Sequence, residues 1–364
     1  MKRIYLLSVL VVLLTGCFAP AGEAVKMDGR ENYFMTVLGD LHFDGKEYHI
    51  TEPQWPGSKR ERERNLAQWQ GKSQLVLDAA NKASSKDTPF IIQLGDITQG
   101  DCDNVELQSA AFKDVFGVLK KYFPGRKIFS LTGNHDNRGM ADAPDAVDEA
   151  FVPLLKNELG ADVEMDGSNY AVLYGRDLYI FYDYSKRSSA AFVKKMLTEN
   201  PDTRHVFFLT HLPMFPCSNG NPGWLVGGFD ELIPLLAERG AVVLCAHTHY
   251  FGHQIYKCEK GILPQLSVVS MGYQWTPGAK ITEDITSFDQ WKSKIRKRYY
   301  EESDYKDSIK RVAKFKNSDF IKFIRYKYIP SGFVNLEVTQ DKVVAHIHTD
   351  NSGKAAKSIV LKGE

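Results

Sequence analysis

The chain lacks most of the features that would assign it to a specialised class of protein. Its 364 residues carry a formal net charge of only +1, so no overall attraction to anionic lipid is expected and no nucleic acid is predicted as a stable partner. The five cysteines include no Cys-x-x-Cys pair, which argues against a structural zinc ribbon. Internal repeats and low-complexity tracts are also absent. With 43% hydrophobic residues, the chain still has enough apolar material for a sizeable core.

The N-terminus carries the longest apolar run, but this run is too short to cross a bilayer as a permanent helix. It extends from Ile4 to Leu14 after Lys2-Arg3, a pattern typical of a secretory signal. The sequence Leu-Thr-Gly-Cys that ends at Cys17 resembles the lipobox of bacterial lipoproteins, in which cleavage leaves the cysteine as the lipid-modified first residue. We therefore predict a signal peptide over residues 1–16 and a lipid-attached tether over 17–30. The protein would be exported and lipid-anchored to the bacterial cell envelope, facing the periplasm or the cell surface.

Four cysteines remain after Cys17, and an oxidising compartment would permit disulfides between them. They are Cys102, Cys217, Cys245 and Cys258. Three pairings are possible and the sequence does not choose among them. A bridge between Cys102 and Cys217, or one between Cys245 and Cys258 across a hairpin, is conceivable.

The rest of the chain alternates short apolar runs with stretches of helical spacing. Each run is almost continuously hydrophobic, as expected of a strand that is buried on both faces. The runs are Tyr33 to Leu38, Phe90 to Leu94, Lys127 to Leu131, His205 to Leu209 and Ala241 to Cys245. The helical stretches cover about residues 60–83, 104–122, 145–159, 189–199 and 228–238. This alternation predicts an α/β domain built from right-handed crossovers.

Other parts of the domain, which we expect to extend over residues 31–364, depart from this alternation. Residues 169–184 and 332–348 each contain two strand-like runs around a turn, which predicts two hairpins. Residues 277–328 are predicted to be a helical insertion before the last hairpin. From Lys292 to Lys327 this insertion has 13 Lys or Arg against 5 Asp or Glu. It is either a solvated basic face on an apolar stripe, or a lid or docking surface for an anionic partner.

Residues that can bind metal ions follow every one of the five apolar runs. They are Asp40 and His42, then Asp96, then Asn134, His135 and Asp136, then His211, and finally His247 and His249. Their oxygen and imidazole ligands suit Mn, Fe or Zn, and the carboxyl ends of parallel strands meet at one sheet edge. Asp40 and His42 are two residues apart, as are His247 and His249, so an extended backbone would point both members of a pair the same way. The sequence therefore predicts one metal-binding crevice.

The order of these motifs resembles the calcineurin-like metallophosphoesterase superfamily. The motifs are Asp-x-His, Gly-Asp, Gly-Asn-His-Asp, His and x-His-x-His, and they lie within residues 39–249. The resemblance implies an α/β fold, a four-layer αββα sandwich of two mixed β-sheets flanked by helices. It also implies two divalent or trivalent metal ions (Mn, Fe or Zn), one held by Asp40, His42 and His249, the other by Asn134, His211 and His247, with Asp96 bridging both. His135 would be the catalytic histidine beside the leaving group, oriented by Asp136.

Two positions depart from the patterns of the superfamily. Ala246 stands where the last motif usually begins with Gly, a change of one methyl group that puts no ligand in doubt. Gln99 stands where purple acid phosphatases have a tyrosine, so the colour that tyrosinate gives to iron is not expected.

The resemblance and the charge balance of the site together imply a reaction. Two divalent ions bring more positive charge than Asp40, Asp96 and a hydroxide remove, so the site would attract phosphate. A metal-bridging hydroxide would attack a phosphate mono- or diester, His135 would protonate the leaving oxygen, and no phosphoenzyme would form. The alternative is a non-catalytic surface lipoprotein that uses the metal site or the basic insertion for binding. The oligomeric state is not predicted.

Two further residues are candidates for contact with the substrate. Arg138, three residues past His135, would contact the substrate phosphate or lie in a surface turn. Trp224 lies in the loop from Pro213 to Gly228, where it would stack on a base or sugar or pack within the loop.

Overall fold

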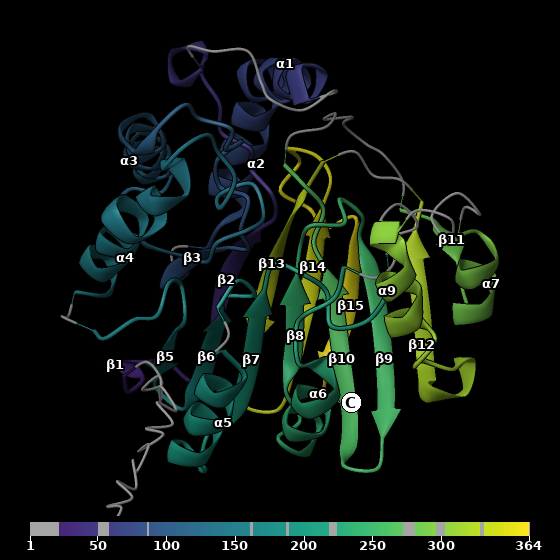
Figure 1. Cartoon of the computed structure of the whole chain (residues 1–364). Helices are drawn as coiled ribbons and strands as arrows, with labels where there is room; N and C mark the ends of the chain where they lie inside the picture. Colours follow the sequence, from purple (N-terminus) through teal and green to yellow (C-terminus); the bar gives the residue numbers. More distant parts are fainter. Residues whose placement is uncertain are drawn as a thin grey trace, which may run out of the picture.

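The computed structural model describes residues 22–49, 58–85, 87–160, 163–186, 189–217, 224–271, 281–295, 303–327 and 331–363. These residues form two β-sheets with helices outside them (Figure 1). The six-stranded sheet has the order β15-β14-β13-β2-β3-β4, and the nine-stranded sheet has the order β1-β5-β6-β7-β8-β10-β9-β12-β11. Parallel and antiparallel pairs occur in both sheets. The predicted sandwich of two mixed sheets is therefore confirmed.

The strands of the six-stranded sheet are β2 (Tyr33–Leu38), β3 (Phe90–Gln93), β4 (Lys127–Ser130), β13 (Phe333–Val338), β14 (Val343–His348) and β15 (Lys357–Lys362). Those of the nine-stranded sheet are β1 (Val25–Met27), β5 (Tyr170–Tyr174), β6 (Asp177–Tyr182), β7 (His205–Thr210), β8 (Val242–Cys245), β9 (Gly252–Cys258), β10 (Gly261–Ser267), β11 (Glu283–Ile285) and β12 (Phe320–Tyr326). All five predicted strands and both predicted hairpins are present.

The α-helices are α1 (Ser58–Gln68), α2 (Gln74–Ala83), α3 (Val105–Tyr122), α4 (Val152–Leu159), α5 (Ser189–Glu199), α6 (Phe229–Glu238), α7 (Phe288–Ser293) and α9 (Ser303–Val312). Two π-helical segments, η2 (Trp69–Ser73) and η4 (Val147–Phe151), connect or extend them. Short 3-10 turns are η1 (Lys46–Tyr48), η3 (Ala143–Asp145) and η5 (Asn317–Asp319). Each predicted helical stretch contains at least one of these helices.

Strand β6 shows why the apolar runs of this protein are continuous rather than alternating. Tyr179 and Phe181 point into the core between the two sheets, whereas Leu178, Ile180 and Tyr182 pack in the second core, under the outer helices. Because both faces of the strand are buried, both sets of side chains are apolar.

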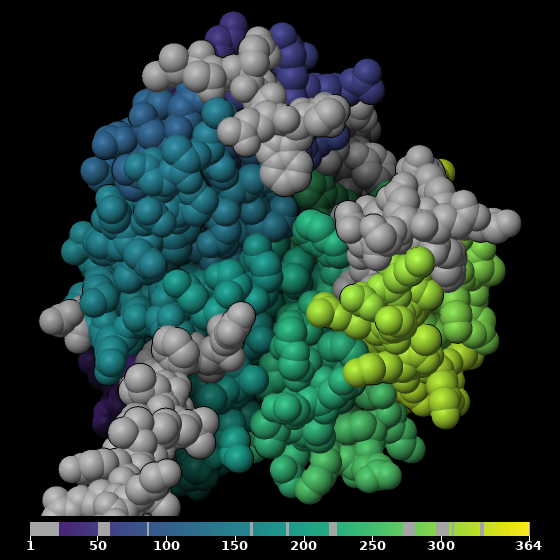
Figure 2. Space-filling view, in the orientation of Figure 1, coloured from purple at the N-terminus to yellow at the C-terminus, as the bar shows by residue number. Residues whose placement is uncertain are grey.

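The insertion differs from the prediction because it is not purely helical. In its described part, α7 and α9 are accompanied by β11 and β12, which form the last two strands of the nine-stranded sheet. Phe288 and Trp291, one helical turn apart, are buried against Phe323 of β12. The sequence of β12, Phe-Ile-Lys-Phe-Ile-Arg-Tyr, does not alternate apolar with polar residues, so it gave no sign of a strand within the predicted helical insertion. Figure 2 shows the yellow-green residues of this segment gathered beside the green part of the surface.

The predicted tether also joins the fold earlier than expected. Val25, Lys26 and Met27 form β1, which pairs in parallel with β5 at the edge of the nine-stranded sheet. Three residues are too short a run for the periodicity of a strand to be recognised. The predicted signal peptide and Cys17 lie outside the described residues. Within the described residues, no helix combines the length and the hydropathy that a membrane crossing requires.

The four described cysteines are all unpaired, and three of them are buried. Cys245 lies beside Ser267 in the sheet, and Cys258 lies beside Gly261. These positions are at opposite ends of β10, roughly 20 Å apart at the rise of a strand, which is too far for a disulfide. Cys102 pairs through its backbone with Gly139, whereas the Cβ of Cys217 lies near Gly252, so the other proposed bridge is absent as well.

A buried polar network joins the two sheets at the end away from the carboxyl ends of β2 and β6. Asp177, fully buried at the start of β6, accepts hydrogen bonds from the Tyr33 hydroxyl of β2 at 2.8 Å and from Nε of Arg204 at 2.9 Å. Replacing Asp177 by Ala would leave both donors without their acceptor. We predict that Asp177→Ala lowers the free energy of unfolding by about 3–5 kcal/mol, measured by urea denaturation. Asp202→Ala, in an exposed turn, is the control, and a loss from Asp177→Ala no larger than its loss would contradict the prediction.

Candidate metal centre

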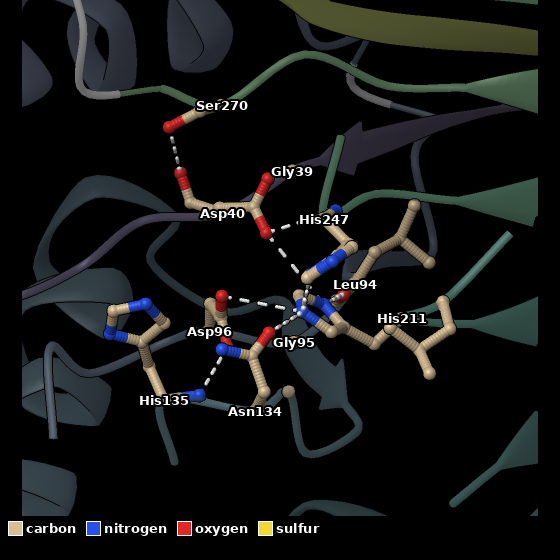
Figure 3. Close-up of polar contacts among 12 residues, drawn as sticks. Gly39, Asp40, Leu94, Gly95, Asp96, Asn134, His135, His211, His247 and Ser270 are labelled. Atoms are coloured by element: carbon tan, nitrogen blue, oxygen red, sulfur yellow. Dashed lines mark hydrogen bonds and ion pairs between the residues drawn. The ribbon is translucent and has the colours of Figure 1, made fainter. Parts of the chain in front are cut away.

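The seven predicted metal ligands lie together at one end of the two sheets, and the position of each follows from a strand. Asp40 and His42 follow β2, Asp96 follows β3, Asn134 follows β4, His211 follows β7, and His247 and His249 follow β8. Figure 3 shows Asp96 and Asn134 pointing toward the His211 ring. Three groups have potential ligand atoms within 4.8 Å of one another: Asp40 with His42 and His249, His42 with Asp96 and His135, and Asp96 with His211 and His247.

The first group has the form of a binding site for a cation. The Nε2 atoms of His42 and His249 lie 3.4 Å apart, and Nε2 of His249 lies 3.7 Å from Oδ2 of Asp40. That Oδ2 is buried and has no hydrogen-bond partner among the described residues. A buried carboxylate oxygen is costly without a partner, and a cation between these atoms would provide one.

The second group is arranged around His211. Its Nε2 lies 3.1 Å from Oδ1 of Asn134, 3.3 Å from Oδ2 of Asp96 and 3.3 Å from Nδ1 of His247. Its Nδ1 lies 2.9 Å from the carbonyl oxygen of Leu94, which fixes the ring and leaves Nε2 for the site. Asp96 belongs to both this group and the group with His42 and His135, which is the placement that a bridging ligand requires.

The backbone brings the ligands together by left-handed turns rather than by the predicted extended conformation. His42, Asp96, His247 and His249 have φ values of 48°, 50°, 63° and 56°. A residue other than glycine rarely adopts such values, and when it does the strain commonly marks a functional site. The extended backbone predicted for these pairs is therefore wrong, and only Asp40 and His42 fall in the same group, whereas His247 and His249 fall in different groups.

Two glycines allow the strand ends to approach one another. A Cβ atom on Gly133 would lie 2.2 Å from Oδ1 of Asp96, and one on Gly95 would lie 2.7 Å from Nδ1 of His211. Neither distance is possible for a real side chain, so glycine is required at both positions.

Burial sets the ionisation of the ligands. It raises the pKa of Asp40 to about 7, with a further increase from the charge of Asp96. Burial lowers the pKa of His249 to about 3 and holds the pKa of His42 well below its usual range. It also acts to lower the pKa of His211, but the Asp96 and Asp40 carboxylates outweigh it and raise that pKa to about 9. Because metal ions bind neutral imidazoles and ionised carboxylates, binding would release protons from Asp40 and His211.

His135 lies beside His42 of the first group, and its role as the catalytic histidine stays a prediction. Its ring lies edge-on to that of His42, with centroids 4.5 Å apart, and its backbone N–H donates to Oδ1 of Asp96 at 2.7 Å. Its Nδ1 lies 2.7 Å from the carbonyl oxygen of Gln99. A carbonyl can only accept, so Nδ1 carries a proton.

Asp136 does not orient His135, in contrast to the prediction. Its two oxygens accept hydrogen bonds from the backbone N–H groups of Ile97, Thr98 and Gly133 and from the Thr98 hydroxyl. Asp136 therefore joins the loop after β3 to the loop after β4. Burial raises its pKa to about 7, and the charge of Asp96 adds to this. The sequence could not show that a backbone carbonyl, rather than the neighbouring carboxylate, holds His135.

The two predicted substrate residues have different surroundings. Arg138 donates from Nη2 to Asp101 at 2.6 Å and to Glu61 at 3.1 Å, so its guanidinium is engaged within the protein. Trp224 stacks on the ring of His247, with centroids 4.8 Å apart and planes 10° apart, and is 40% exposed. Both substrate roles stay predictions.

Glu61 is a residue near the site that sequence reasoning missed. Its Oε1 lies 3.9 Å from Nε2 of His135. It belongs to α1, whose sequence alternates acidic and basic residues and so carries no signal that separates one glutamate from the next.

Comparison with known proteins identifies the class to which this fold and site belong. Residues 35–251 match the sequence pattern of the calcineurin-like phosphoesterases, and the chain belongs to that family. It is a metal-dependent phosphoric ester hydrolase, and the family implies two metal ions. Comparison with curated protein sequences gives no match.

Solved structures with the same fold come from distant proteins. GAP50, the anchor in the inner membrane complex of Plasmodium, is 11% identical with a TM-score of 0.50, over 92% of this chain and 90% of that one. The purple acid phosphatase PPD1 of yellow lupin (Lupinus luteus) seeds is 11% identical with a TM-score of 0.55, over 93% of this chain and 55% of the lupin chain. PhoD is 9% identical with a TM-score of 0.51, over 92% and 72%. These likenesses establish the fold.

The close approach of Gly133 to Asp96 leads to a test of the metal centre. We predict that Gly133→Ala displaces Asp96 and abolishes binding of at least one of the two metal ions, measured by elemental analysis after dialysis against Mn²⁺. The control is Gly117→Ala in α3, where a Cβ atom meets nothing within 4 Å. This control should keep its metal and gain up to about 1 kcal/mol of stability from helix propensity. Full metal content in Gly133→Ala would refute the assignment of Asp96.

Proposed function

We propose that the protein is an exported phosphoesterase, attached to the bacterial cell envelope through Cys17, that hydrolyses a phosphate mono- or diester without a phosphoenzyme. The observation that carries the catalytic part is the convergence of Asp40, Asp96 and five further ligands from five strand ends on one buried space. The part concerning export rests on the N-terminal sequence.

The residues around this space divide the chemistry among them. Two bound metal ions would supply an activated water and neutralise the phosphate charge. The protonated Nδ1 of His135 is held by Gln99, so Nε2 faces the site and is the atom that can deliver a proton to the leaving oxygen. Asp96 holds the His135 backbone in place, which couples the position of this acid to the position of the metal ligands.

The position of Trp224 favours a substrate that carries a flat or apolar group. One face of the indole covers the His247 ring, while the exposed part of the side chain adjoins the metal centre. Aromatic faces stack readily on bases, sugars and aryl groups. An ester that carries such a group would be held beside the second group of ligands.

The alternative, a lipoprotein that only binds a partner, is less well supported. Every ligand position of the motif is filled, as expected of a working enzyme. Several basic residues of the insertion are also already paired with carboxylates. These pairs are Lys294 and Arg325 with Asp284, and Lys314 with Asp230.

The catalytic proposal predicts the behaviour of two variants. Comparing bis-p-nitrophenyl phosphate with p-nitrophenyl phosphate, in the presence of Mn²⁺, identifies the preferred ester class. On the phenyl ester of that class, His135→Ala should lower kcat about 100- to 10,000-fold and keep its metal, whereas Asp96→Ala should lose both turnover and metal. His346→Ala on β14, where the ring pairs with Glu337, is the control. Turnover in Asp96→Ala, or a trapped phosphoenzyme, would contradict the mechanism.

The attachment proposal predicts the fate of Cys17. The wild-type chain, expressed in a bacterial host with labelled palmitate, should incorporate the label and sediment with membranes. Cys17→Ser should do neither, whereas Cys258→Ser should behave as the wild type. Label in Cys17→Ser, or its absence from the wild type, would show that Cys17 is not the site of lipid attachment.

A further inference from the structure

One face of helix α1 lies near Nε2 of His135 and also contacts Gln99, the residue that holds Nδ1. Glu61 and Asn65 are four residues apart, so they lie on the same side of the helix. Oε1 of Glu61 lies 3.9 Å from Nε2 of His135. The Asn65 side chain donates to the side-chain oxygen of Gln99, whose backbone carbonyl lies 2.7 Å from Nδ1 of His135. Figure 1 shows α1 at the end of the molecule toward which β7 and β8 point.

The Glu61 carboxylate is itself held in place. Its Oε2 accepts a hydrogen bond from Arg138 at 3.1 Å, and Oε1 lies 3.6 Å from Nη2 of Arg64. Arg138 is anchored in turn by Asp101 at 2.6 Å, a residue that is almost fully buried. Such a chain of contacts reduces the freedom of Glu61, which is a requirement for a group that must act at a defined position.

We propose that Glu61 is a positioning residue for His135, and that the device serves phosphate esters whose leaving group is an alcohol. The inference rests on the proposed function. The Glu61 carboxylate, 3.9 Å from Nε2, would attract the ring when both nitrogens carry protons, and would so hold it in the orientation from which the Nε2 proton is delivered to the leaving oxygen. As the P–O bond breaks, its electron pair stays on the leaving oxygen, and the proton passes to that oxygen from Nε2. An alcohol departs poorly as an alkoxide and so depends on this delivery, whereas p-nitrophenolate does not.

Because Glu61 is negatively charged, its effect on catalysis can be distinguished experimentally from an effect on folding or on substrate binding. A carboxylate near the mouth of the site repels an anionic substrate, so its removal should not weaken substrate binding. Loss of positioning, by contrast, should affect the chemical step. A positioning role therefore lowers kcat while KM stays the same or falls.

The test compares Glu61→Gln with wild type on esters of one class whose leaving groups are p-nitrophenol, phenol and a simple alkyl alcohol. We expect kcat to fall about 10- to 100-fold for the alkyl ester, by less than about 3-fold for the p-nitrophenyl ester, and by an intermediate factor for phenyl. KM should not rise. The melting temperature and the metal content from elemental analysis should match the wild type. Glu63→Gln is the matched control, because Glu63 faces a different hollow with Lys59 and Arg62.

A double variant completes the test. If Glu61 acts through His135, then Glu61→Gln added to His135→Ala should cause no further loss of kcat. Equal losses for all three leaving groups, additive losses in the double variant, or no loss in Glu61→Gln would each overturn the inference. Absence of turnover by the wild-type protein on every ester would instead overturn the proposed function.

Discussion

Two carboxylates and four imidazoles lie close together at one end of the sheets, where burial makes the charged forms of Asp40, His42 and His249 unfavourable. Burial raises the pKa of Asp40 to about 7 and lowers the pKa of His249 to about 3, so these two groups are shifted toward their neutral forms. The Oδ2 atom of Asp40 has no protein partner among the described residues. A cation would reverse the shift of Asp40, because it favours the ionised carboxylate, and it would bind the His249 imidazole that burial already keeps neutral. The metal ion would therefore gain binding free energy from a carboxylate that has no other partner in the protein.

The fold holds these ligand side chains close together, although their burial is unfavourable. The ligands leave the sheets through left-handed turns at His42, Asp96, His247 and His249, and such strain persists only where the surrounding structure enforces it. The two cores provide that enforcement, since strands such as β6 are packed on both faces. Asp136 adds a local constraint by tying the loop that carries Asp96 to the loop that carries Asn134. Rigid strands and short tied loops therefore hold groups that would otherwise separate.

The sequence predicted those parts of the fold that show in the pattern of apolar and polar residues along the chain. Runs such as His205 to Leu209 coincide with strands because burial on both faces gives a continuous apolar signal, and the residue after each run is placed by the strand itself. Contacts between residues that are distant in the sequence and meet only in the folded chain could not be predicted. Gln99 holds His135 through a backbone carbonyl, which any residue type could supply, and β12 has no alternation of apolar and polar residues that would mark it as a strand. For the same reason nothing in the helix α1 sequence distinguished Glu61 from Glu63.

In this protein, helix α1 and the strand ends act on different parts of the site. The ligands depend on strand ends, which a change in a surface helix hardly affects. His135 depends on strand ends for its backbone, through Asp96, but on α1 for the environment of its ring, through Glu61 and through Asn65 with Gln99. Substitutions on one face of α1 can therefore alter the orientation of the acid without disturbing the metals. Selection for particular leaving groups would act on this helix, whereas selection for hydrolysis itself would act on the sheets.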